Sequence, residues 1–334
     1  MIPLPKPYKP LFFFFLLLRE NDIFKPTDPQ EKAIPHILNN EHVLLLAPTG
    51  HGKTESAILP IFDKFLRDVK PLKNIEKGIS ILYVTPLRAL NRDMLRRTFE
   101  WGETLGISIA VRHGDTTKSE RAKQSRNPPD MLITTPETFQ ILFTGKRLRA
   151  HLHHVRWLII DEIHELAYDE RGAQLSVAME RLEELTGTVG HSFQRIGLSA
   201  TVGSAQEVSK YLGGHTNDGP RTVSIIDVDA TKNVELTVEL PQITKEHEKI
   251  AAKFSMETLS ASALLRCKDL VEDHVSTLIF INTRDGAEIL ATRFHQYYPD
   301  FPIGVHHGSL SKEARIEAED QFKDSTLQAL ICTS

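Results

Sequence analysis

Short apolar segments recur along the chain, and each is followed by a turn and then a helical pattern. They are Val43–Leu46, Ile79–Val84, Met131–Ile133, Trp157–Ile160 and Arg195–Leu198. A strand with one face in water alternates apolar and polar residues, whereas a strand covered on both faces is apolar throughout. Helices between such strands imply a parallel sheet. The sequence therefore predicts an α/β domain in which a parallel sheet is flanked by helices.

A second, shorter pattern of the same kind begins after about residue 245. Its expected strands and helices are Thr277–Ile281, Gly286–Tyr298, Ile303–Val305, Lys312–Lys323 and Leu327–Ile331. A glycine-rich break at Tyr211–Pro220 and two extended segments, Thr222–Val228 and Val234–Pro241, precede it. A chain of 334 residues is long enough for two domains with separate cores. We expect an N-terminal segment at 1–22, a first domain at 23–222, a linker at 223–244 and an incomplete second domain at 245–334.

Charge and composition exclude few functions. The net charge is −4, so a nucleic acid would have to be held by backbone amides and helix N-termini rather than by a lysine-rich face. Two cysteines with no metal or redox spacing, Cys267 and Cys332, indicate a reduced, cytoplasmic protein. The apolar run Leu11–Leu18 is too short for a bilayer, which takes about 20 helical residues, so no membrane partner is expected.

A phosphate-binding loop follows the first apolar segment, in the sequence Ala47-Pro-Thr49-Gly50-His51-Gly52-Lys53-Thr54. The glycines allow backbone amides to turn inward around an anion. Lys53 would reach the β- and γ-phosphates of ATP, and the Thr54 hydroxyl would hold Mg²⁺. The strand before the loop and the helix after it are the context that this motif requires.

An acidic pair follows another apolar segment. Asp161 would bind Mg²⁺ and Glu162 would orient and deprotonate the attacking water. Taken alone, the pair would be equally typical of a helix N-cap. Gln30, ahead of the loop, has an amide that could donate to and accept from an adenine edge. The sequence thus predicts an ATP site with catalytic residues Lys53, Asp161 and Glu162.

The order of these motifs resembles the first domain of a superfamily 2 helicase and, more narrowly, the large helicase-related (Lhr) family of DExH helicases. The resemblance rests on Phe24 to Gln30, the phosphate loop, Thr85-Pro-Leu-Arg-Ala-Leu-Asn-Arg-Asp-Met-Leu-Arg-Arg97, Val111-Arg-His-Gly-Asp-Thr116, Asn127-Pro-Pro-Asp130, Thr134-Thr-Pro-Glu137, Asp161-Glu-Ile-His-Glu-Leu166, Arg171-Gly-Ala-Gln-Leu175 and Ser199-Ala-Thr201. It extends from about Phe24 to the last residue. It implies two RecA-like domains with ATP between them and a single strand of nucleic acid across their top.

The resemblance also assigns roles to individual residues. In the first domain, the residues that contact the nucleic acid would be Pro86, Arg88, Gly114, Thr135, Pro136 and Glu137. The residues that couple ATP hydrolysis to movement would be His164, Ser199 and Thr201. In the second domain, the motifs Phe280-Ile-Asn-Thr-Arg284 and His306-His-Gly-Ser309 and the strand Leu330-Ile-Cys-Thr333 supply Thr283, Arg284, Gly308 and Thr333. Without the resemblance, helix capping and packing would explain these residues as well.

The sequence departs from the family pattern at two places: His51 is expected to be tolerated because the phosphate loop is built from backbone, whereas the end of the chain affects the predicted function. His51 occupies a loop position where a small residue is usual, and the sequence ends at Ser334, before the stretch that supplies an arginine finger. Such a finger contributes about 10³–10⁵ in rate in related hydrolases. We therefore expect an ATP-dependent helicase or translocase on single-stranded DNA, with weak hydrolysis by this chain alone. An RNA helicase and a non-catalytic, ATP-dependent nucleic-acid-binding module remain as alternatives.

Overall fold

The structure is a computed structural model that describes residues 26–71, 77–86, 92–200, 203–228, 235–240 and 242–333. The chain divides into two compact units, Met1–Lys232 and Asn233–Ser334, which are described separately. The apolar run Leu11–Leu18 and the predicted N-terminal segment lie outside the described residues. In the part of the chain that is described, no helix is both long and apolar enough to cross a membrane.

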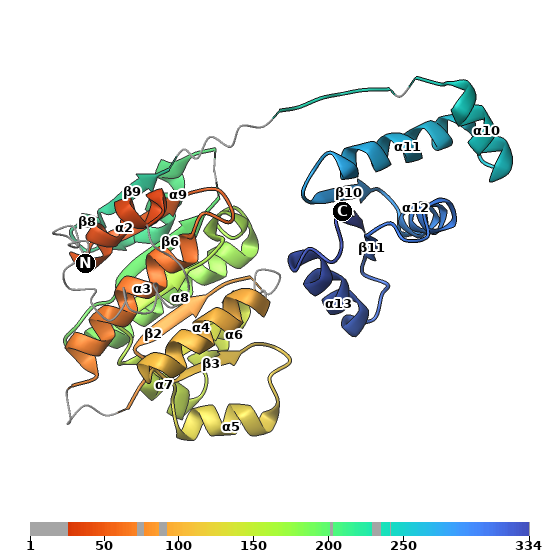
Figure 1. The fold of residues 1–334 in the computed structure, drawn as a ribbon. Helices are drawn as coiled ribbons and strands as arrows, with labels where there is room; N and C mark the ends of the chain where they lie inside the picture. The colour runs from red at the N-terminus through yellow and green to blue at the C-terminus, as the bar shows by residue number, and fades with distance from the viewer. Residues whose placement is uncertain are drawn as a thin grey trace, which may run out of the picture. The chain divides into compact units, whose positions relative to one another are not determined.

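The first unit contains a parallel sheet of seven strands in the spatial order β3-β4-β2-β5-β6-β1-β9. Figure 1 labels β2, β3, β6 and β9 of this sheet. The strands are β1 (His42–Leu46), β2 (Ile81–Val84), β3 (Ile109–Arg112), β4 (Met131–Thr134), β5 (Trp157–Ile160), β6 (Gln194–Ser199) and β9 (Val223–Asp227). Every neighbouring pair is parallel. The parallel sheet that the apolar segments predicted is confirmed.

Helices connect these strands. They are α2 (Asp28–Leu38), α3 (Lys53–Lys64), α4 (Arg92–Leu105), α5 (Lys118–Arg126), α6 (Pro136–Leu142), α7 (Lys146–Leu152), α8 (Glu170–Gly187) and α9 (Ala205–Gly213), with a π-helical turn at Phe65–Val69 and a 3₁₀ turn at Ile163–Glu165. Local signals start several of them: the Thr117 hydroxyl caps α5, and the Asp169 carboxylate accepts from the Gly172 amide at the start of α8.

Strand β1 explains why the strands are apolar throughout. Val43 and Leu45 belong to a core with α2, α3 and α4, whereas Leu44 and Leu46 belong to a second core with α6, α7, α8 and α9. Side chains of a strand point alternately to its two faces, so a strand between two helical layers has no polar face. The sheet is therefore the middle layer of three.

The structure corrects the predicted boundary of the first domain. Residues 223–227 were expected in the linker, but they form β9, which pairs with β1 from Val223 opposite His42 to Asp227 opposite Leu46. The glycine-rich segment before it is a short antiparallel pair, β7 (His215–Thr216) and β8 (Gly219–Pro220), and not a domain boundary. Strand β3 was not predicted, because its residues are mostly half-buried at the sheet edge and its apolar run is only three residues long.

The second unit has a parallel sheet in the order β10-β12-β11. Its elements are α10 (Lys245–Lys253), α11 (Thr258–Glu272), β10 (Thr277–Ile281), α12 (Arg284–Tyr297), β11 (Ile303–His306), α13 (Lys312–Lys323) and β12 (Ala329–Thr333). Strand β12 begins two residues later than predicted, because the Leu327 amide donates to the Gln321 carbonyl instead of joining the ladder. Residues 235–240 are not part of a sheet in the described chain, and Leu236 and Val238 are exposed there.

Candidate functional site

The candidate residues of the first unit follow the carboxyl ends of its strands, and the sheet order divides them into two groups. The phosphate loop follows β1, the acidic pair follows β5, and Ser199 ends β6; these three strands are adjacent in the sheet. The predicted nucleic-acid contacts follow β2, β3 and β4, which form the other half. Because open parallel sheets bind ligands at their carboxyl edge, this edge is the candidate site.

The phosphate loop has the backbone that its glycines predict. Gly50 and Gly52 both have φ of +81°, a left-handed conformation that disfavours side chains. At Gly52 a Cβ would also lie 2.7 Å from the Gln30 side-chain nitrogen, so a side chain there would displace the Gln30 amide as well as strain the backbone. His51 lies between them, and its ring faces the Thr49 carbonyl at 3.2 Å. The histidine is thus accommodated in a loop built from backbone.

Lys53 is turned into the loop. Its ammonium group donates to the Ala47 carbonyl at 2.9 Å, and the side chain is 7% exposed. An ammonium group held at the mouth of a helix N-terminus is a natural partner for an anion. The loop therefore has both elements of a phosphate site, a free helix start at α3 and a positioned cation.

Gln30 lies against this loop, although it comes from helix α2. Its side-chain oxygen accepts from the Thr27 amide at 3.1 Å, and the Thr27 hydroxyl donates to the His51 carbonyl at 3.0 Å. The start of α2 is thus tied to the phosphate loop. The sequence suggested that the Gln30 amide could both donate to and accept from adenine; in this structure its oxygen is engaged by the helix cap, which leaves the nitrogen.

Asp161 is buried at the end of β5. It accepts hydrogen bonds from the Tyr83 hydroxyl at 2.6 Å and from the Glu162 amide at 3.0 Å. Burial raises the pKa of the Asp161 carboxyl to about 6, against the lowering effect of the Tyr83 hydrogen bond. A buried carboxylate with this tendency to remain protonated is the kind of group that a nearby cation would stabilise in its charged form.

Glu162 has a strained backbone and a connected side chain. Its φ of 49° is unusual for a residue with a Cβ, and such outliers gather at functional sites. One carboxylate oxygen lies 3.4 Å from Nδ1 of His164, and the same nitrogen lies 3.1 Å from the Ser199 hydroxyl. Glu162, His164 and Ser199 therefore form one chain of contacts between β5 and β6. Thr201, the third predicted coupling residue, lies outside the described residues.

Three further polar residues belong to this group but were not predicted. Tyr83 is fully buried, and its hydroxyl contacts both Asp161 and Thr54, with burial raising its pKa well above the usual value. Glu55 pairs with Arg97 and so joins α3 to α4. The signal for Tyr83 was available: a phenol inside an otherwise apolar strand needs a hydrogen-bond partner when it is buried.

The predicted nucleic-acid contacts differ in how much of each residue is accessible. Pro86, Thr135 and Pro136 are buried, and the Thr135 hydroxyl caps α6 by accepting from the Thr138 amide. Glu137 is paired with Arg171 at 2.7 Å. Gly114 is exposed, with no described atom within 4 Å of where a Cβ would stand. Arg88 lies outside the described residues. A strand of nucleic acid at this edge of the sheet would thus contact backbone groups and helix N-termini.

The second unit brings its own candidates together at the carboxyl edge of its sheet. Thr283 caps α12, and the Arg284 guanidinium donates to the Ser309 hydroxyl at 2.9 Å, which joins the loops after β10 and β11. A Cβ on Gly308 would lie 3.5 Å from the same guanidinium. Thr333 ends β12, the strand between them.

Comparison with known families matches both units. The profile described as DEAD/DEAH box helicase matches residues 27–208, and the profile described as helicase conserved C-terminal domain matches residues 260–334.

Individual relatives agree with the profiles. The ATP-dependent helicase Lhr-Core protein 2 of Thermococcus barophilus and Lhr-Core of Methanothermobacter thermautotrophicus are each 38% identical over 323 residues, covering 92% of this chain and 36% of the relative. The chain thus spans about a third of the length of these relatives. The structure of Mycobacterium smegmatis helicase Lhr bound to ssDNA and AMP-PNP aligns with a TM-score of 0.72 and 32% identity, over 98% of this chain and 42% of that one.

Proposed function

The chain belongs to the DEAD/DEAH box helicase family, and we propose that it carries the ATP-binding motor of a helicase that moves on single-stranded DNA. The observation that carries this proposal is the convergence on one sheet edge of the phosphate loop, the buried Asp161, and the contact chain through Glu162, His164 and Ser199. These groups follow or end three adjacent strands, and together they supply a phosphate loop, a metal-binding carboxylate and a general base, the parts that nucleotide hydrolysis uses.

We assign the roles within the site from these contacts. The Lys53 ammonium would exchange the Ala47 carbonyl for phosphate oxygens, and the glycine-rich loop would add its amides. Glu162 would accept a proton from the attacking water. His164 contacts both Glu162 and Ser199, so a change in the protonation of the Glu162 carboxylate would alter the contacts at the end of β6. The Gln30 nitrogen, which lies 2.7 Å from where a Cβ on Gly52 would stand, would donate to the nucleotide from α2.

The residues present also fit a magnesium ion. Thr54 and Asp161 both contact the Tyr83 hydroxyl, so an alcohol and a carboxylate oxygen lie near one another, and oxygen ligands are the ones that this ion prefers. Bound there, Mg²⁺ would neutralise phosphate charge. The burial that raises the pKa of Asp161 is offset when a cation is its neighbour.

DNA is proposed over RNA because the relative of solved structure that is 32% identical is bound to ssDNA. The buried Thr135 and Pro136 leave amides and a helix start for the strand, which suits contacts to phosphate rather than to bases. The free cysteines Cys267 and Cys332 fit a reducing compartment, and we propose a cytoplasmic location.

The test is ATP binding and steady-state hydrolysis with and without matched DNA and RNA strands. Glu162→Gln should retain ATP binding and lower turnover by about 10²–10⁴-fold, the range for a general base. Lys53→Ala should lose ATP binding. Glu165→Gln, an exposed carboxylate in the same turn, is the matched control and should behave like the unmodified chain.

Three outcomes would contradict the proposal, each in a different part. If Glu162→Gln and Glu165→Gln hydrolyse ATP equally, Glu162 is not the base. Undiminished ATP binding in Lys53→Ala would reject the proposed nucleotide site. Greater stimulation of ATP hydrolysis by RNA than by DNA would mean that the helicase moves on RNA.

A further inference from the structure

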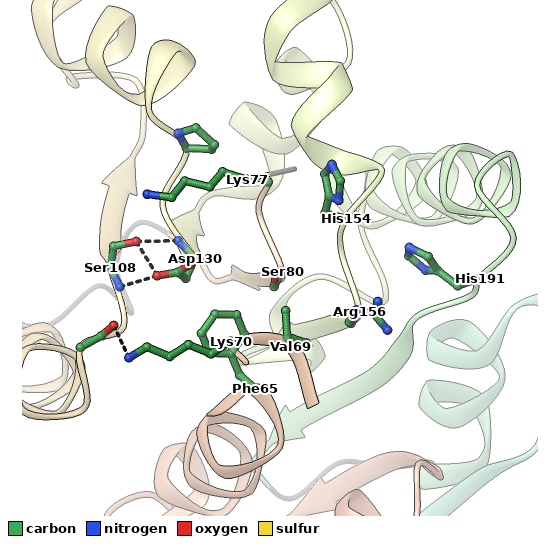
Figure 2. A pocket seen from close by; sticks show the side chains of 13 residues that line it. Phe65, Val69, Lys70, Lys77, Ser80, Ser108, Asp130, His154, Arg156 and His191 are labelled. Carbon is green, nitrogen blue, oxygen red and sulfur yellow. Dashed lines mark hydrogen bonds between the residues drawn. The ribbon is translucent and has the colours of Figure 1, made fainter. Parts of the chain in front are cut away.

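A cavity of about 370 Å³ opens at the amino ends of the strands of the first unit, on the edge opposite to the phosphate loop (Figure 2). Ser80 precedes β2, Asp130 precedes β4 and Arg156 precedes β5, and all three line it. The phosphate loop and Asp161 follow their strands instead. In a parallel sheet these are opposite edges, so the cavity is separate from the proposed nucleotide site.

Two of the charged side chains that line this cavity, Asp130 and Lys70, already have hydrogen-bond partners in the fold. The Asp130 carboxylate accepts from the amide and hydroxyl of Ser108, at 2.7 and 2.6 Å. Lys70 donates to the carbonyls of Leu105 and Gly106, both at 2.8 Å, beyond the end of α4. These contacts satisfy the single described carboxylate among the lining residues and one of the cations.

The remaining cations have no such partner. Arg156 is half-buried and Lys77 is exposed. Among the described residues, no carboxylate forms an ion pair with either side chain. No nitrogen of Arg156 is among the buried polar atoms of the described residues that lack a partner, so its guanidinium reaches solvent and its donors are available to a ligand in the cavity.

Two histidines, His154 and His191, also line the cavity. Figure 2 shows His154, Arg156 and His191 on one side of the cavity, the Ser108–Asp130 pair on the other, and Lys77 reaching between them. Nδ1 of His191 is buried with no hydrogen-bond partner among the described residues, and such atoms call for an explanation. The ring of His154 packs on Gly78, where a Cβ would lie 2.0 Å from it. The glycine therefore makes room for the histidine at the cavity wall.

We propose that this cavity binds a phosphate-bearing anion, either orthophosphate or a small phosphate monoester, through Arg156 and Lys77. A guanidinium matches phosphate oxygens in a two-pronged geometry, and an ammonium group adds a point charge. The hydroxyl of Ser80 lines the same cavity and can donate to an oxygen. The volume lies within the roughly 300–1,000 Å³ of small-molecule sites, so a phosphate ester of modest size has room.

The test uses the full chain with Lys53→Ala, which removes the other phosphate site. Orthophosphate binding is measured by titration calorimetry in this background. Arg156→Gln should weaken it at least about tenfold and Arg156→Lys by less, since lysine keeps the charge but loses the fork. Lys77→Gln should weaken it several-fold. Arg147→Gln, the same charge change at an exposed position on α7 outside the cavity, should leave it unchanged.

A second arm distinguishes the sources by replacing orthophosphate with glucose 6-phosphate. Tighter binding of the ester identifies a monoester as the ligand, and tighter binding of orthophosphate identifies the free ion. Absence of orthophosphate binding in the Lys53→Ala chain, or equal binding by Arg156→Gln and Arg147→Gln, would overturn the proposal. ATP binding by Arg156→Gln with Lys53 intact shows that the variant is folded and that the two sites are independent.

Discussion

Strands β1 and β10 are equally apolar in sequence but are covered differently. In β1, the four residues from Val43 to Leu46 are buried, because helices pack on both faces of the sheet. In β10, Leu278 is 51% and Phe280 is 66% exposed, while Ile279 and Ile281 pack against the core with α11 and α12. A continuous apolar run thus indicates that a strand can be covered on both faces, and the elements around it decide whether it is.

The same contrast runs through the two units. The first unit has two large cores, one on each face of its sheet, and buries polar groups such as Asp161 and Arg195. The second unit has smaller cores, and its helix α13 has no buried residue. We therefore expect substitutions in the first unit to change stability more than similar ones in the second.

The largest expected difference is between two phenylalanines. Phe62→Ala, at a fully buried position on α3, should lower the free energy of unfolding of the first unit by about 3–5 kcal/mol. Phe280→Ala, on the open face of β10, should change that of the second unit by less than about 1 kcal/mol. Hydrogen exchange read separately for each unit measures both, and equal losses would refute the contrast.

Arginine pairs provide the second comparison. The guanidinium of Arg195 is fully buried and bonds Glu180, Glu183 and the carbonyl of Gly213. Arg221 also donates to Glu180 and to the Gly213 carbonyl, so Arg195→Met would remove only the Arg195 share of this buried network. It should destabilise the first unit by about 2–4 kcal/mol. The surface pair of Arg266 with Glu239 should be dispensable, so Arg266→Met should leave the thermal unfolding of the second unit unchanged. A large effect of Arg266→Met would mean that this pair orders the segment before α10.

The third prediction concerns pH. Burial, with Arg195 and Arg221 nearby, lowers the pKa of His42 from 6.5 to about 4, and its Nδ1 accepts from the Arg195 amide. Between these values the unfolded chain binds more protons than the folded one, so the first unit should lose stability as pH falls from 6.5 to 4. Allowing for partial exposure, the loss from this group is about 1–2 kcal/mol.

His42→Asn keeps an acceptor near the same place and removes the titration. Urea unfolding of the first unit should therefore depend less on pH in this variant over that range. An unchanged pH profile would assign the acid sensitivity to other groups.

The smallest predicted effect concerns backbone strain, which occurs at the same angle in both units. Glu162 and Ser255 each have φ of 49°. Glycine adopts this conformation freely, so Glu162→Gly and Ser255→Gly should each stabilise their unit by about 1 kcal/mol. Only Glu162→Gly should abolish ATP hydrolysis. A gain at Ser255 without one at Glu162 would show that the Glu162 side chain, through His164, contributes as much stability as its backbone loses.

Much of the fold was predictable because it depends on local patterns. The apolar runs placed most strands to within a residue or two, and the glycines of the phosphate loop have the positive φ that the motif implies. Less was predictable where a residue acts at a distance. The contact of the Tyr83 hydroxyl with Asp161 and the pairing of β9 with β1 each join segments that are far apart in the chain, and no local pattern predicts them.

The sequence by itself determined what each segment could do: which strands could be buried on two faces, which turns required glycine, and which side chains could bind phosphate or hold a proton. Only the tertiary structure decided which segments became neighbours. Lys53, Asp161 and Ser199 come together because the sheet order places β1, β6 and β5 side by side, and Gln30 reaches the phosphate loop because α2 packs against α3. The physical reason is that local conformation follows from nearby residues, whereas strand order depends on how all the helices together cover both faces of the sheet.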